Sequence, residues 1–231
     1  MKLSIIIPAY NEERFLDIMI QKVLNVPLPY GLQKEVIVVN DGSTDKTSEI
    51  INKYPVSSSC KVIHLSKNKG KSFAVSQGVK SSTGDLILIQ DADLEYNPDD
   101  YPILLEPIMC SGAQVVNGSR FKGETKKMTI INRLANLLTN KTLNLLYHAR
   151  ITDVNSGYKV FRREVLKDIT ITSNHFALET ELTVKMLKKG YSIVEVPIHY
   201  SARTRAEGKK INWWTALKLY FGLFKYKFIR D

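Results

Sequence analysis

Apolar and polar positions alternate in blocks along the first half of the chain. Short apolar runs bounded by polar residues predict buried strands at 3–9, 35–40, 61–65 and 86–89. Segments with an apolar stripe at helical spacing predict helices at 12–25, from the turn 41–45 to about 53, and at 71–82, with Ser43 or Thr44 capping the second helix. This alternation is typical of an α/β protein with a mostly parallel, doubly wound sheet and right-handed crossovers.

Polar side chains gather directly after three of the predicted strands. Tyr10 and Glu12 follow the first strand, Asp41 follows the second, and Asp91 and Asp93 follow the fourth. In open α/β sheets, ligands bind beyond the carboxyl ends of the strands. We therefore expect these side chains to line one ligand crevice.

The acidic pair Asp91 and Asp93 follows a strand that carries no charge. In an extended chain the two carboxylates lie on the same side and repel each other unless a cation lies between them. A hard divalent ion that keeps several waters and also binds substrate phosphates meets that need, and oxygen ligands suit Mg²⁺ and Mn²⁺ alike. The alternative is a solvated acidic turn that caps the helix after Pro98. The acidic pair alone does not distinguish the two, so the choice depends on the motifs around it.

Composition indicates an ordinary globular chain. Its 231 residues are 44% hydrophobic and 24% charged, which is enough for one substantial core. Cys60 and Cys110 lack metal or redox spacing and suit a reducing cytosol. Because no run of about eighteen apolar residues occurs and the first apolar run is short, we expect neither a spanning helix nor a signal peptide.

The net charge of +10 is unevenly distributed. The segments 125–152 and 208–230 contain no acidic residue, yet together they hold 11 of the 33 lysines and arginines. Such segregation predicts that one face meets a polyanion, which could be a membrane surface, a nucleic acid or a phosphorylated substrate.

Three common nucleotide-site patterns are disfavoured. No GxGxxG follows the first strand, which argues against the usual dinucleotide fold. Residues 68–72 end like a phosphate loop, but Leu65 stands where that motif requires glycine. Receiver domains also collect carboxylates at strand ends, but they are much shorter than this chain.

A series of short motifs runs through nearly the whole chain in one order. They occupy 7–12, 39–45, 68–71, 91–93, 118–120, 153–159, 179–181, 200–203 and 207–211. Taken together, they resemble the family 2 glycosyltransferases of the GT-A fold, and within them the dolichyl (polyprenyl) phosphate mannose or glucose synthases. Glu95 departs from the Gln or His often found at this position in the mannose synthases, which leaves the sugar and the base open.

The resemblance implies a nucleoside pocket formed by Pro8, Tyr10, Glu12 and Asp41. In this interpretation Asp41 accepts a hydrogen bond from the base. Asp91 and Asp93 form the metal site, which neutralises the diphosphate leaving group, and Asp93 is counted among the catalytic residues.

The resemblance also implies that Arg120, Arg203 and Lys209 clamp phosphates. Lys71 is either a substrate-binding residue or a solvated residue at a helix start. Glu179 is either an acceptor-side residue or a carboxylate favoured by a helix dipole.

Asp153 has two candidate roles. In transfer to a sugar hydroxyl, a carboxylate must take the proton, and Asp153 or Glu179 would be that base. A phosphate acceptor is already anionic near neutral pH, so Asp153 would then position metal or basic residues.

The two basic segments have an amphipathic pattern. On a helical wheel the large apolar residues of the tail fall within roughly 120°: Trp213, Trp214, Leu217, Tyr220, Phe221, Phe224 and Phe228. Lysines flank this face, which is typical of a helix lying in the headgroup plane of a membrane. For residues 128–147, membrane contact and packing on the core or a dimer seam both stay open.

These observations predict a catalytic domain at 1–207, with a nucleotide-sugar half at 1–95 and an acceptor half at 96–207, and a basic membrane-surface tail at 208–231. The hypothesis is an inverting, metal-dependent hexosyltransferase, peripheral on the cytosolic membrane face. It would move mannose or glucose from GDP-mannose or UDP-glucose to dolichyl or polyprenyl phosphate. Either the tail anchors the chain or a membrane-anchoring subunit does.

Other functions remain as alternatives. The acceptor could be a glycan or a lipid-linked sugar hydroxyl. A nucleic-acid-binding protein is suggested only by the charge, and since no RNA-binding motif is present we expect no nucleic-acid partner. A silent nucleotide-sugar-binding scaffold is disfavoured by the intact acidic pair and by Arg203.

Overall fold

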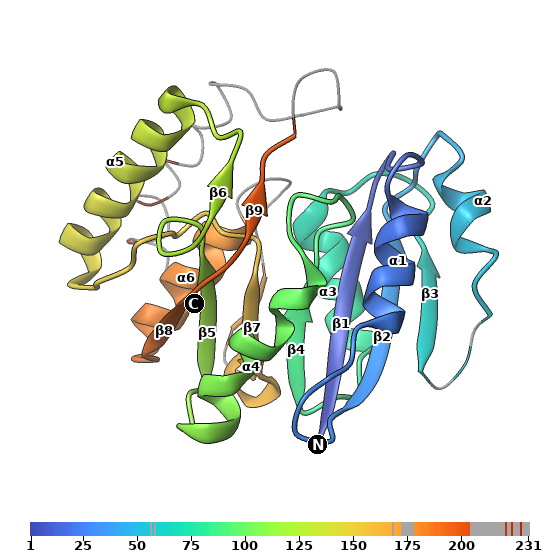
Figure 1. Cartoon of the computed structure of the whole chain (residues 1–231), viewed down its shortest axis with the longest axis horizontal. Coiled ribbons are helices and arrows are strands. Elements are labelled where there is room, and N and C mark those ends of the chain that lie inside the picture. Colours follow the sequence, from blue (N-terminus) through green and yellow to red (C-terminus); the bar gives the residue numbers. More distant parts are fainter. Residues whose placement is uncertain are drawn as a thin grey trace.

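A seven-stranded sheet forms the centre of the computed structural model, which describes residues 1–55, 57, 59–167, 169–171, 178–203, 220, 223 and 227 (Figure 1). The strand order is β3-β2-β1-β4-β7-β5-β8. These strands are β1 (Lys2–Ala9), β2 (Gln33–Asn40), β3 (Cys60–His64), β4 (Leu86–Ile89), β5 (Val115–Ser119), β7 (Lys159–Arg162) and β8 (Ile193–Pro197). A second sheet pairs β6 (Thr125–Lys126) with β9 (Tyr200–Ser201).

Most neighbouring strands of the large sheet run parallel. β1 pairs in parallel with β2 and β4, β2 with β3, and β5 with β8, whereas β7 is antiparallel to both β4 and β5. The predicted α/β fold with a mostly parallel sheet is therefore confirmed. Because β1, β2 and β4 are adjacent and parallel, their carboxyl ends meet at one edge.

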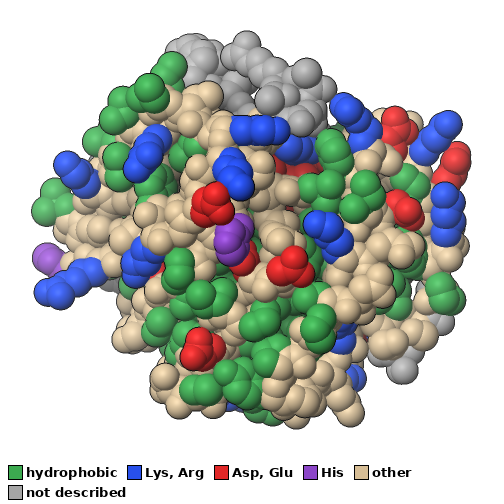
Figure 2. All heavy atoms as spheres, in the orientation of Figure 1, with side chains coloured by type: hydrophobic (Ala, Val, Ile, Leu, Met, Phe, Trp, Pro, Cys, Tyr) green, Lys and Arg blue, Asp and Glu red, His purple; other side chains and the backbone are tan. Residues whose placement is uncertain are grey.

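Helices cover both faces of this sheet, and one helix lies at its side. They are α1 (Leu16–Asn25), α2 (Thr47–Ile51), α3 (Lys71–Ser81), α4 (Tyr101–Cys110), α5 (Ile130–Tyr147) and α6 (Leu178–Lys188), with short 3₁₀ turns at Pro98–Asp100 and Arg163–Leu166. In Figure 2, hydrophobic side chains lie along the surface edge where Figure 1 places α5.

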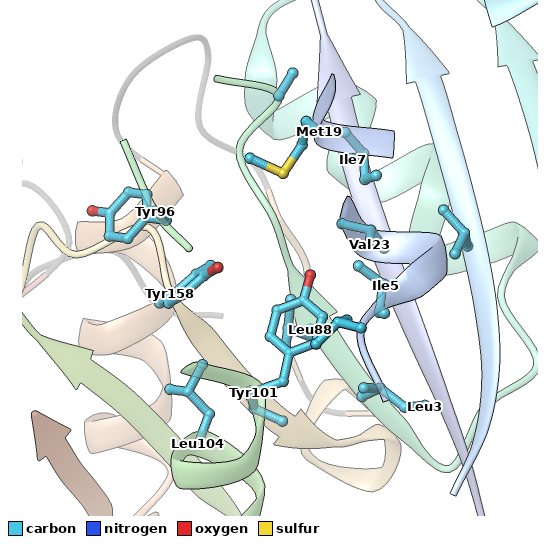
Figure 3. Packing of buried hydrophobic residues seen from close by; sticks show 14 of the residues in the cluster. Leu3, Ile5, Ile7, Met19, Val23, Leu88, Tyr96, Tyr101, Leu104 and Tyr158 are labelled. Atoms are coloured by element: carbon cyan, nitrogen blue, oxygen red, sulfur yellow. The ribbon is translucent and has the colours of Figure 1, made fainter. Parts of the chain in front are cut away.

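Alternation along β1 divides the core into two clusters. Leu3, Ile5 and Ile7 share a buried cluster with residues of α1 and α4, as Figure 3 shows. Ile6 points to the other face, where its cluster includes residues of α3 and α6. A strand covered on both faces must be apolar at successive positions, which explains why the sequence shows uninterrupted apolar runs here.

Two details of the predicted helices are wrong. The helix after β1 begins at Leu16 rather than at residue 12, because Asn11 adopts a φ of 52° and a turn from Glu12 precedes the helix. Neither Ser43 nor Thr44 caps α2. Their hydroxyls contact Asn11 instead, and Asp45 Oδ1 accepts the Thr47 N–H bond at 2.9 Å.

The predicted tail helix and Lys209 lie outside the described residues, except for Tyr220, Leu223 and Lys227. Tyr220 contacts Thr142 of α5, and Leu223 belongs to a small apolar cluster that includes Leu143. None of the helices within the described ranges has both the length and the hydropathy to cross a membrane.

Candidate active site

A cavity of about 470 Å³ opens at the carboxyl ends of β1, β2 and β4. This volume lies within the usual range of small-molecule sites. Most of the residues predicted for the site line this cavity: Pro8, Tyr10, Glu12, Asp41, Lys71, Asp91, Asp93, Arg120, Glu179 and Arg203. Asp153 is fully buried behind the lining, and Lys209 lies outside the described residues.

Lys71 joins two acids that are far apart in the sequence. It is the first residue of α3, and its ammonium group forms an ion pair with Asp91 and another with Glu179 Oε1 at 2.6 Å. Burial would lower the pKa of Lys71, but the two carboxylates outweigh that effect and raise it. Lys71 is therefore a fixed positive charge in the wall of the cavity.

Arg203 follows β9 and lies among three other acids. Its Nη2 is 2.6 Å from Asp93 Oδ2, and its Nη1 donates to Glu12 Oε2 at 3.0 Å. Glu95 accepts a hydrogen bond from the Arg203 backbone N–H at 2.7 Å. Among the described residues, the buried Arg203 Nε has no hydrogen-bond partner, and the nearest charge to it is Glu95 Oε1 at 3.8 Å.

The acids after β4 are held close together with little solvent around Asp93. Burial, followed by repulsion from Asp91 and Glu95, raises the pKa of Asp93 to about 7, although Arg203 opposes the shift. A cation beside Asp93 would favour its ionised form.

The carboxylates after β4 suit a divalent ion that takes only some of its ligands from the protein. Within the described ranges, no three acidic, histidine or cysteine side chains form a complete metal centre. Two carboxylates, Asp91 and Asp93, can still hold an ion that keeps several waters and takes its remaining ligands from substrate phosphates.

Asp41 organises the loop at residues 67–70 beside the cavity. Its Oδ1 and Oδ2 accept the backbone N–H groups of Lys69 and Gly70, both at 2.8 Å. Gly42 makes this approach feasible, since it has a φ of +66° and an added Cβ would lie 2.5 Å from the Lys67 carbonyl carbon.

Asp153 forms a buried, two-point ion pair with Arg120. Its Oδ2 accepts from Arg120 N at 2.9 Å and from Nε at 2.7 Å, and its Oδ1 accepts from Nη2 at 2.7 Å. Burial alone would lower the pKa of Arg120, but Asp153 keeps it well above its usual value. The two-point geometry fixes the guanidinium plane at the cavity wall.

Glu195 of β8 supports this pair and was not predicted from the sequence. Its side chain is 2% exposed. Oε2 accepts from the backbone N–H and the hydroxyl of Thr152 at 2.8 and 2.6 Å, and Oε1 accepts from the Asp153 backbone N–H at 3.1 Å. The sequence signal was a lone acid between apolar residues of a strand, where an unpaired charge is costly.

Tyr96 and Tyr200 form one aromatic wall of the cavity, and the sequence did not predict that the two rings pack together. Their ring centroids are 5.1 Å apart, and the Arg120 guanidinium lies 5.0 Å from the Tyr200 centroid. Tyr96 Oη accepts the Gly157 N–H bond at 2.8 Å. A Cβ at Gly157 would lie 2.5 Å from Asp91 Oδ2, so only glycine fits between the acid and the ring.

Comparison with known proteins gives a consistent result. The chain is 34% identical to a dolichol-phosphate mannosyltransferase of Pyrococcus furiosus over 90% of its own length and 59% of that relative. It therefore spans little more than half of that protein. It is 29% identical to a dolichyl-phosphate β-glucosyltransferase of Trichomonas vaginalis, over 96% of this chain and 72% of the relative.

The structural comparison defines the fold class. The crystal structure of glucosyl-3-phosphoglycerate synthase from Mycobacterium tuberculosis with Mn²⁺, UDP and phosphoglyceric acid matches with a TM-score of 0.75 and 22% identity, over 100% of this chain and 80% of that one. The fold is thus that of the GT-A glycosyltransferases. The family model for glycosyl transferase family 2 matches residues 4–170. The chain belongs to glycosyltransferase family 2.

Proposed function

We propose that this chain is an inverting hexosyltransferase that moves mannose or glucose from a nucleoside diphosphate sugar to a dolichyl or polyprenyl phosphate. In this proposal residues 1–95 hold the donor, residues 96–207 receive the acceptor, and residues 208–231 lie on the cytosolic membrane face. GDP-mannose and UDP-glucose are the two candidate donors. The names of the two curated relatives support a lipid phosphate as the acceptor class.

The observation that carries the proposal is the disposition of acids and cations around the cavity. Lys71, Arg120 and Arg203 place three positive groups at its wall. Asp153 is 0% exposed, and both of its oxygens accept from Arg120. Glu179 is paired with Lys71. Because both candidate bases, Asp153 and Glu179, are already paired with cations, these contacts favour an acceptor that arrives as an anion and needs no base.

In the proposed reaction, an oxygen of the acceptor phosphate attacks the anomeric carbon opposite the diphosphate. The new carbon–oxygen bond forms as the bond to the diphosphate breaks, and the leaving oxygen keeps the electron pair, so the configuration inverts and no proton need move. Arg120 and Arg203 would orient the two phosphate groups. Asp91 and Asp93 would hold the divalent ion, Mg²⁺ or Mn²⁺, which offsets the charge on the leaving diphosphate.

The test is transfer of radiolabel from a panel of nucleotide sugars into organic-extractable lipid, with purified protein, polyprenyl phosphate and Mg²⁺ or Mn²⁺. We expect label in the lipid with one donor, and its loss with EDTA or with Asp93→Asn. Asp99→Asn is the matched control, because Asp99 is an exposed acid that does not line the cavity.

Two results would count against the proposal. Label that enters a glycan or a lipid-linked sugar, but not the lipid phosphate, would favour a hydroxyl acceptor with Glu179 as the base. Equal lipid labelling by Asp93→Asn and the unchanged protein would remove the metal site from the mechanism.

A further inference from the structure

Helix α5 exposes an unusual amount of apolar surface. Its large side chains are among the most exposed hydrophobic groups of the described chain: Ile130 (77%), Ile131 (75%), Leu134 (60%), Leu137 (40%), Leu138 (56%) and Leu145 (77%). Scattered exposed apolar residues are common on soluble proteins, but a contiguous apolar face indicates a contact surface.

These six side chains form one face of the helix. At about 100° per residue, they fall within an arc of about 120°, with Lys141 inside the same arc. The opposite side of α5 contributes Asn132, Asn136 and Thr139 to the lining of the cavity. One helix therefore separates the active-site cavity from the exposed apolar face.

The described charges near this face are mostly basic, and the exposed Glu124 pairs with Lys126. The segment 125–152, which contains all of α5, has no acidic residue. Lys126, Lys127 and Arg150 are exposed beside the helix, Arg133 is exposed on the helix, and Lys141 is exposed on the face itself. In Figure 2, blue side chains lie among and beside the green ones along this edge of the molecule. An apolar stripe with basic residues around it complements a bilayer that contains anionic lipids.

We propose that the outward face of α5 is a docking surface for an anionic lipid bilayer. Its apolar side chains would enter the interface while the lysines and arginines contact the headgroups. The consequence for the acceptor rests on the proposed function: a lipid phosphate would reach the cavity along α5 without leaving the membrane.

Two other occupants can be separated by experiment. The tail is one, but its described residues contact other parts of α5: Tyr220 meets Thr142, and Tyr147 Oη donates to the Leu223 carbonyl at 2.8 Å. A second copy of the chain is the other, and its signature would be a dimer in solution that depends on the apolar face.

The test is flotation of the full chain with phosphatidylcholine vesicles, with and without phosphatidylglycerol. We expect binding to the anionic vesicles, weaker binding at high salt, and a loss of at least about tenfold in the double variant Ile131→Ser/Leu134→Ser. The matched control is Ile18→Ser/Leu24→Ser, because these α1 side chains are 47% and 38% exposed on another surface.

Further readouts decide between the occupants and separate this inference from the proposed function. The α5 variant should keep normal transfer to a short, water-soluble polyprenyl phosphate and lose transfer to a long-chain acceptor in vesicles. Vesicle binding that is unchanged in the variant would overturn the docking surface. So would a wild-type dimer that ignores vesicles and becomes monomeric in the variant. Vesicle binding without transfer to any lipid phosphate would support docking and contradict the proposed function.

Discussion

Two buried carboxylates at opposite ends of the parallel part of the sheet, Glu35 in β2 and Asp93 after β4, are stabilised very differently. At the amino end, Glu35 accepts hydrogen bonds from Ser4 Oγ at 2.5 Å and Thr83 N at 2.8 Å, and Lys61 Nζ lies 2.8 Å away. Burial alone would raise the pKa of Glu35, but these partners lower it to about 2. At the carboxyl end, burial and neighbouring acids raise the pKa of Asp93 to about 7.

The two ends of the sheet therefore differ in how far the charge of the buried carboxylate is compensated. Glu35 is surrounded by donors, so its charge is compensated within the chain. Asp93 shares its surroundings with Asp91, Glu95 and Glu12, and Arg203 supplies the positive charge in contact with it. Acids kept close together without full compensation are a feature of ligand sites.

The largest expected effect comes from removing the charge at the carboxyl end. Asp93→Asn should lower sugar transfer by roughly 10³-fold, because the divalent ion would lose a charged ligand and would no longer offset the charge on the leaving diphosphate. Steady-state kinetics with Asp99→Asn as control measures this. In EDTA, the free energy of unfolding of the unchanged protein should fall as pH rises from about 4 to 7, because folded Asp93 binds a proton more tightly than in the unfolded chain. Asp93→Asn should lack this slope, and an identical slope would contradict the assignment.

Removing the charge at the amino end should instead affect stability. Glu35→Gln leaves Lys61 without its carboxylate partner and turns an amide donor toward other donors, which should cost about 2 kcal/mol in the free energy of unfolding. Urea titration measures this, with Glu49→Gln, an exposed acid of α2, as control. Turnover of the folded enzyme should be unchanged, and a large loss of turnover would show that the two ends are coupled.

The free energy of unfolding at acidic pH gives a second test of the difference between Glu35 and Asp93. Because the folded-state pKa of Glu35 is lowered to about 2, its contribution is complete above its unfolded value near 4.5 and is lost as pH falls toward 2. Urea titrations in this window should give a steeper pH dependence for the unchanged protein than for Glu35→Gln. Parallel curves would contradict the assigned pKa shift.

The smallest effect is expected from Glu195, which holds the loop at Thr152 and Asp153 and does not line the cavity. Glu195→Gln should loosen the loop at Thr152 and Asp153, and with it the orientation of Arg120, which should lower kcat/KM for the donor about tenfold. The control is Glu124→Gln, because Glu124 is an exposed acid that does not line the cavity. Donor kinetics that match the control would mean that Asp153 holds Arg120 without Glu195.

Much of the fold followed from local patterns. The strand at 86–89 was predicted with its observed bounds, and the helix at 71–82 within one residue. The start of α1 and the cap of α2 were predicted wrongly for one reason. Asn11, Ser43 and Thr44 have the side chains of turn and cap residues, but they bond to each other across two strand ends.

The candidate site was predicted in part. Motif order identified ten of the residues that line the cavity, but not those that α5 contributes, such as Asn136 and Thr139. It also did not identify the support from Glu195 or the pairing of Tyr96 with Tyr200. The support given by Glu195 depends on β8 lying next to β5 in the sheet. Spacing along the chain does not reveal such a neighbour.

Taken alone, the sequence determined the order of strands and helices and the edge at which the acids collect, because burial on two faces and strand polarity act over short stretches of chain. Only the tertiary structure decided which charges meet. Lys71 and Glu179 are 108 positions apart, and Glu12 and Arg203 are 191 apart. Ion pairs and pKa shifts depend on distances of a few ångströms and on burial, and both are set by how the elements pack together.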